Sequence, residues 1–238
     1  MQVVGLIGYV DKYDFVINLA KTINIMEKSV LVVDATLDRK LKNVIPALNT
    51  IGKSYVTQYS NIDFALGFNS MHDVENYMCE QGINIGLYDY ILIDIDSPKS
   101  YEFFRSRGID KHYIFIDTNI LSINKNKEII KAIRVYNQLT EDKMKLQKVY
   151  FKSYYSRAAN DYFEKNIAEY DVEWLEPDYE VQMTEVDIMQ NIDSQFSGII
   201  SIKKHSKMYI DLLADMAADL IEDATPKMVK NQIKRRKE

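Results

Sequence analysis

The first 23 residues constrain the fold most tightly, because they read as a buried strand, a short loop and an amphipathic helix. Residues 3–8, Val-Val-Gly-Leu-Ile-Gly, form an apolar run that suits a strand buried on both faces of a parallel sheet. In residues 15–23, apolar side chains recur at the spacing of one helix face. Phosphate-binding loops are built from a strand, a tight loop and a helix in this order. The function therefore depends first on whether residues 8–14 bind phosphate.

Further apolar runs alternate with segments of helical periodicity along the rest of the chain. We expect strands over residues 29–35, 88–94, 112–117 and 148–154, a short edge strand over 171–175, and a short strand over 55–58. Residues 62–68 fit either a strand or a helix. We expect helices over 71–82, 101–107, 125–135, 157–168, 181–192 and 202–221, the last being the longest. This alternation predicts an α/β fold with a mostly parallel, doubly wound sheet flanked by helices.

Composition divides the chain into a main body and a basic end. Short polar connections without a Pro/Gly-rich linker predict one α/β domain over residues 1–225. Residues 226–238 carry a cluster of lysines and arginines, although the net charge of the whole chain is −5. We expect a flexible, solvated tail there. Contact of Lys227–Lys237 with an acidic membrane surface or with DNA is the alternative.

The sequence favours a cytoplasmic protein without a metal held by side chains alone. No segment resembles a signal peptide, and no apolar run approaches the roughly 18 residues that cross a bilayer. The single cysteine, Cys79, excludes an internal disulfide framework. The three histidines are scattered and give no metal-ligand spacing.

The loop itself departs from the pattern Gly-x-x-x-x-Gly-Lys-[Ser/Thr], in which backbone N–H groups surround phosphates and the hydroxyl holds magnesium. With Lys12 in the lysine position, Gly8 and Lys12 fit the loop. Leu6 replaces the first glycine, Asp11 the second, and Tyr13 the Ser/Thr hydroxyl. A carboxylate at Asp11 repels phosphate oxygens. The loop therefore keeps its lysine and loses most of its other phosphate ligands.

The two carboxylates of the loop favour a second interpretation. Asp11 is placed to cap the amino end of the helix, and Asp14 follows at the near spacing of a capping box. The helix dipole favours these side chains for the same reason that it favours phosphate. On this interpretation Lys12 is solvated or ion-paired with Asp11 or Asp14.

Two further aspartates end apolar strands. Asp34 and Asp94 follow residues 30–33 and 90–93, at the edge where open α/β sheets place ligand-contacting groups. In nucleotide hydrolases such carboxylates position water or coordinate magnesium through water. The structural alternative is that each aspartate caps the following turn.

These segments together resemble the MinD/ParA branch of deviant-Walker P-loop NTPases over roughly residues 2–222. The resemblance lies in the first strand and loop, Asn18-Leu19-Ala20-Lys21, and the strands ending at Asp34 and Asp94. Residues 174–178 and 191–204 resemble the CpaE/TadZ-type members, which help to localise pilus or secretion machinery. The resemblance implies that Gly8 and Lys12 belong to the nucleotide loop, that Asp34 is the switch I aspartate and that Asp94 is the Walker B aspartate.

Three other ligand positions of that family are changed here. The signature lysine that reaches across the dimer falls on Ile7, the second acidic residue of switch I on Thr36, and the adenine-contacting asparagine near Lys152. The resemblance therefore implies a pseudo-ATPase that localises or scaffolds a membrane-associated assembly, with protein partners and a homodimer. No cofactor is expected, and any ATP and magnesium binding is expected to be weak.

Two alternatives stay open. One is an active but divergent ATPase of the same family, with Lys12, Asp34 and Asp94 as its catalytic residues. The other is a DNA-partition protein that binds through its basic end, which predicts binding that weakens steeply with salt.

Overall fold

The fold is built on one sheet of eight strands with the order β3-β4-β2-β5-β1-β6-β7-β8. The structure is a computed structural model that describes residues 1–46, 53–137, 143–151 and 156–236. All neighbouring strands pair in parallel except β3 and β4, which form an antiparallel hairpin. The strands are β1 (Gln2–Ile7), β2 (Val30–Asp34), β3 (Tyr55–Tyr59), β4 (Ile62–Leu66), β5 (Tyr90–Ile95), β6 (Lys111–Ile116), β7 (Met144–Phe151) and β8 (Val172–Val181).

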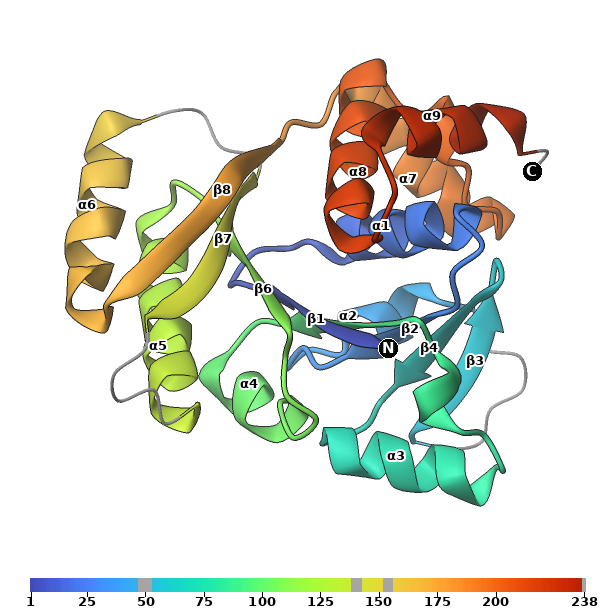
Figure 1. Ribbon diagram of the computed structural model, residues 1–238, viewed down its shortest axis with the longest axis horizontal. Coiled ribbons are helices and arrows are strands. Elements are labelled where there is room, and N and C mark those ends of the chain that lie inside the picture. Colours follow the sequence, from blue (N-terminus) through green and yellow to red (C-terminus); the bar gives the residue numbers. More distant parts are fainter. Residues whose placement is uncertain (47–52, 138–142, 152–155, 237–238) are drawn as a thin grey trace.

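Helices cover both faces of this sheet, as Figure 1 shows. The first face carries α1 (Tyr13–Ile25), α2 (Lys40–Val44), α7 (Glu185–Ser197), η3 (Ile202–Lys204), α8 (Lys207–Leu220) and α9 (Pro226–Arg235). The second face carries α3 (Met71–Glu80), α4 (Pro98–Phe104), α5 (Ile120–Tyr136) and α6 (Arg157–Ile167), with the short turns η1 (Ile85–Leu87) and η2 (Ala168–Tyr170) in connections. The expected doubly wound α/β fold is thereby confirmed.

Strand β1 lies in the middle of the sheet and fixes where the loop after it lies. It pairs with β5 on one side and β6 on the other, and its side chains from Val3 to Ile7 are buried. Alternate side chains enter separate apolar clusters on the two faces of the sheet. On the first face, Phe15 of α1 makes edge-to-face contacts with Phe115, Phe151 and Tyr209. These contacts anchor α1 directly behind the loop.

The far edge of the sheet is longer than the sequence predicts. The edge strand β8 covers Val172–Val181, whereas residues 171–175 were expected, and a register irregularity lies opposite it between Gln147 and Val149. Pro177 lies inside β8. An edge strand tolerates proline because one side of it needs no ladder hydrogen bond.

Helix boundaries also differ from the prediction. The longest helix is α5, with 17 residues, and it begins at Ile120 rather than near Lys125. The expected helix over 202–221 is divided into η3 and α8, because the Ser206 hydroxyl accepts from the Tyr209 N–H and starts a new helix. Helix α7 begins at Glu185 rather than Val181, where Thr184 and Asp187 form a capping box.

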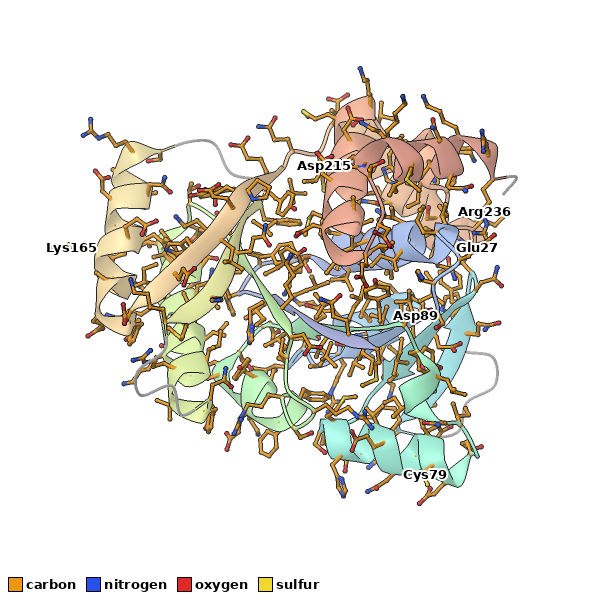
Figure 2. All side chains as sticks on the ribbon, viewed as in Figure 1. Glu27, Cys79, Asp89, Lys165, Asp215 and Arg236 are labelled. Atoms are coloured by element: carbon orange, nitrogen blue, oxygen red, sulfur yellow. The ribbon has the colours of Figure 1, made fainter. Side chains whose placement is uncertain are left out.

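The basic end contradicts the predicted flexible tail over its described part. Residues 226–235 form α9, with Pro226 in its first turn and the Thr225 hydroxyl as its cap. Val229 and Ile233 are buried in the same apolar cluster as α1 and α8. Arg236 donates to the carbonyls of Asn24 and Ile25 at the end of α1, and Figure 2 shows it close to Glu27. Two apolar residues one helical turn apart and the Arg236 hydrogen bonds therefore dock this helix.

Among the helices of the described residues, none has the length and apolar character that a membrane span requires.

Candidate functional site

The loop after β1 starts at a glycine that the packing requires. The N–H of Gly8 donates to the carbonyl of Ile95 at 2.9 Å, and Gly8 has a φ of +153°. A Cβ at this position would lie 2.4 Å from the carbonyl oxygen of Phe115. The next N–H, that of Tyr9, donates to Oδ1 of Asn126 on α5 at 2.8 Å. The start of the loop is thus held between β5, β6 and α5.

Lys12 is buried and holds the loop against β5. Its Nζ forms an ion pair with Oδ1 of Asp94 at 2.7 Å, and both side chains are 1% exposed. The same Nζ donates to the carbonyls of Gly8 at 3.0 Å and Ile95 at 3.1 Å. The prediction that Lys12 is solvated or paired with Asp11 or Asp14 is therefore wrong. Three oxygens surround the ammonium group, which has three donors.

The predicted helix caps are also wrong. Helix α1 begins at Tyr13, and its N-cap residue is Lys12, without a side-chain cap. Asp11 lies one residue too early; its exposed carboxylate is 3.5 Å from Nζ of Lys40. Asp14 accepts a hydrogen bond from Gln195 of α7 at 3.0 Å. Lys12, which pairs with Asp94, is thus the last residue before the helix.

Asp34 lies beside Asp94, because β2 and β5 pair in parallel with these two residues in register. Its Oδ1 accepts from the N–H and hydroxyl of Thr36, the latter at 2.6 Å, and its Oδ2 accepts from the N–H of Lys42. Burial raises the pKa of Asp34, with a smaller contribution in the same direction from the Asp94 charge, while the Thr36 hydrogen bond opposes it. The side chain therefore caps the turn after β2, as the structural alternative predicts.

Asp96, which was not predicted as a site residue, belongs to the same cluster. Its carboxylate accepts from the N–H of Leu37 at 3.1 Å and is largely buried. Burial raises the pKa of Asp96, while the Leu37 hydrogen bond and the Lys12 charge lower it. The available signal was the spacing Asp94-x-Asp96, since alternate residues at the end of a strand point to the same face.

The residues present do not fit a magnesium-nucleotide complex of the usual kind. Asp11 and Tyr13 stand where glycine and a Ser/Thr hydroxyl are needed, and Lys12 is already paired. Ile7, which the sequence resemblance places at a signature lysine position, is fully buried in the apolar cluster of the second face. Thr36 bonds to Asp34 and supplies no second carboxylate. Lys152 lies outside the described residues.

Over the residues that the structure covers, no group of three or more His, Cys, Asp or Glu side chains is arranged to hold a metal ion.

Comparison with known proteins places the fold. No protein-family model matches the sequence, and no curated protein matches it. Among solved structures, the MinC:MinD cell division protein complex of Aquifex aeolicus is similar with a TM-score of 0.62 and 14% identity, covering 94% of this chain and 100% of that one. The MinD cell division protein of the same organism gives 0.58 and 15%, covering 95% and 99%.

A plasmid partition protein of Borrelia burgdorferi gives a TM-score of 0.50 and 14% identity, covering 82% of this chain and 96% of that one. At these identities the likeness is one of fold. The chain therefore shares the fold of these MinD and plasmid partition proteins, a mostly parallel α/β sheet flanked by helices.

Proposed function

We propose that this chain is a MinD/ParA-like pseudo-ATPase that acts as a localisation or scaffolding factor and does not hydrolyse ATP efficiently. The observation that carries the proposal is the contact of Lys12 with Asp94. For Lys12 to reach a phosphate, its Nζ would have to leave a buried carboxylate and two carbonyl oxygens. Separating a buried ion pair leaves a charge without compensation, at a cost of about 3–5 kcal/mol.

The residues on either side of Lys12 also disfavour nucleotide binding. In a working loop the incoming phosphates would repay the lost ion pair through backbone N–H groups and magnesium. Here Asp11 adds a negative charge beside that position, and Tyr13 has no short hydroxyl for magnesium. The net free energy of nucleotide binding is therefore expected to be small.

Helix α7 supports a role in protein binding, because its polarity is inverted. Its inward face is polar: Asn191 accepts from Asn18 of α1 at 2.9 Å, and Asp187 accepts from the N–H of Ser206. Its outward residues are exposed and apolar, namely Val186, Ile188, Met189, Ile192 and Phe196, the last 88% exposed. Exposed apolar patches of this kind are typical of protein interaction sites. The buried hydrogen bonds hold α7 in this orientation.

The kind of assembly comes from the sequence resemblance. Residues 174–178 and 191–204 resemble CpaE/TadZ-type proteins, and this favours a pilus or secretion system with protein partners. We extend the proposal to a homodimer and to peripheral association with the membrane or a cell pole from the cytoplasmic side. Gly8, Lys12, Asp34 and Asp94 are in this view the remains of a nucleotide site.

A nucleotide titration tests the proposal. We expect isothermal titration with ATP, with and without magnesium, to show no tight binding, and a phosphate-release assay to show no turnover. The melting temperature should not rise with Mg-ATP, since only a ligand that binds the native state stabilises it. Tight binding together with turnover, lost in a Lys12→Ala variant that circular dichroism shows to be folded, would instead establish the divergent ATPase.

A variant that restores the loop is the matched control. Asp11→Gly with Tyr13→Thr recreates the order Gly-Lys-Thr after Gly8. Nucleotide binding by this variant but not by the natural chain would attribute the loss to these two residues.

A further inference from the structure

The first face of the molecule contains a basic cavity whose lining includes none of Gly8, Lys12, Asp34 and Asp94. It lies between η3, the first turns of α8, and α9, and its volume is about 580 Å³. The charged residues that line it are Lys203, Lys207, Lys227, Lys230, Lys234 and one carboxylate, Asp211.

The charge of this cavity is opposite to that of the chain. Asp211, the one carboxylate among the lining residues, forms an ion pair with Lys230 at 3.0 Å. The whole chain has a net charge of −5. Like charges gathered in a concave surface repel each other and focus a positive potential there. An anion that enters the cavity relieves this repulsion.

The lysines are held in place by packed elements. Lys227, Lys230 and Lys234 recur at three- and four-residue spacing, on one face of α9. That helix is fixed by the buried side chains of Val229 and Ile233. Lys203 and Lys207 approach from η3 and the start of α8. A flexible tail would lose conformational entropy on binding an anion, whereas this arrangement is already formed.

The shape of the cavity selects among anions. Lysine binds phosphate as a point charge, and several lysines around one cavity suit more than one phosphate group. A volume of about 580 Å³ lies in the usual range for small-molecule sites. Duplex DNA, in contrast, needs an extended basic surface that follows its backbone. We propose that this cavity binds a compact ligand carrying two or more phosphate groups, either a free polyphosphorylated molecule or the headgroup of an anionic lipid.

Two probes distinguish these sources. Tripolyphosphate, titrated without magnesium by calorimetry, represents the free ligand. Phosphatidylcholine vesicles containing phosphatidylinositol 4,5-bisphosphate represent the lipid, and binding is measured by co-sedimentation. Lys227→Gln with Lys234→Gln should weaken binding of the probe about tenfold, because two solvent-facing phosphate contacts are lost.

The matched control is Lys131→Gln with Lys165→Gln, which changes the net charge equally. These exposed lysines lie on α5 and α6, and Figure 2 shows Lys165 far from α8 and α9. The control should bind each probe like the natural chain. Circular dichroism should show that both variants are folded.

Tripolyphosphate binding that the cavity variant loses identifies a free ligand, and vesicle binding alone that it loses identifies a lipid headgroup. Either result supports the proposal. No binding of either probe, or equal binding by the natural chain and the cavity variant, would overturn it. Duplex DNA binding without binding of either probe would also overturn it. Tripolyphosphate that binds at the loop, residues 8–14, would still bind to the cavity variant. A loss of binding in the cavity variant is therefore independent of whether the loop binds nucleotide.

Discussion

At the scale of single residues, the contact between Lys12 and Asp94 decides how the loop is interpreted. The sequence places a lysine in the loop and an aspartate at the end of β5, yet sequence spacing does not show that they meet. Burial of both groups makes them depend on each other, since each charge compensates the other. This pair is therefore a structural element of the loop, and in the proposed function it is also the remainder of a nucleotide site.

Replacement of Lys12 should destabilise the fold. Lys12→Ala leaves the Asp94 carboxylate buried without its partner, and we expect a loss of about 3–5 kcal/mol in the free energy of unfolding. Urea denaturation measures this loss. Lys12→Met combined with Asp94→Leu removes both charges and should recover much of the stability. A Lys12→Ala variant as stable as the natural chain would contradict the role given to the pair.

His112 should make stability depend on pH. Burial lowers the pKa of His112 to about 4, against the opposing effect of Asp110. Between pH 6.5 and 4 the unfolded chain therefore takes up a proton that the native imidazole does not, and stability falls as the pH falls through this range. The contribution of His112 is roughly 3 kcal/mol by the pKa difference.

The comparison with His112→Gln isolates this effect from the carboxylates. The glutamine amide keeps a polar partner for the Tyr101 hydroxyl, which lies 3.2 Å from the imidazole Nε2. Urea denaturation at pH 6.5 and at pH 4.5 should show a smaller drop in the variant. Equal drops in both chains would exclude His112 as the source.

At the scale of helices and strands, α9 shows why a composition-based boundary failed. Lysines and arginines dominate residues 226–238, and this composition is typical of a mobile tail. Proline in the first turn, a threonine cap and the spacing of Val229 and Ile233 favour a docked helix instead. The buried side chains of Val229 and Ile233 indicate that the helix is docked, and a count of charges does not register them.

The docking of α9 can be measured with a pair of substitutions on the same helix. Ile233→Ala removes a side chain that is 2% exposed and should cost about 2–4 kcal/mol of unfolding free energy. Met228→Ala, at a half-exposed position, should change it by less than about 0.5 kcal/mol. Thermal or urea unfolding of the two variants provides the measurement. Equal small effects would mean that α9 does not contribute to the fold.

At the scale of the whole molecule, apolar runs and their alternation with helices were sufficient to predict the sheet and its flanking layers. Strand β5 is an example. Residues 90–93 form an unbroken apolar run in the sequence, and all six residues of the strand are buried in the structure. The ends of elements were harder to predict, since Ser206 fixes one start through a single hydrogen bond and Thr184 fixes another through its capping box with Asp187. The site was predicted as a group of residues, but the partners within it were not.

The reason is that partners in the site come from distant parts of the chain. Lys12 pairs across 82 positions with Asp94, and Asp96 accepts from Leu37 across 59. The inverted polarity of α7 has the same origin, because Asn191 faces inward to meet Asn18. A periodic pattern shows that one face is apolar, and it does not show whether that face is covered.

The buried ion pair of Lys12 has a consequence for timing. When the release of an ATPase from its binding site is coupled to hydrolysis, its turnover rate sets how long it stays bound. On the proposed function, a chain whose loop lysine is held by Asp94 would lack this hydrolysis-dependent timing. Its occupancy of a binding site would then depend on its cellular concentration and on the rate at which its partners dissociate.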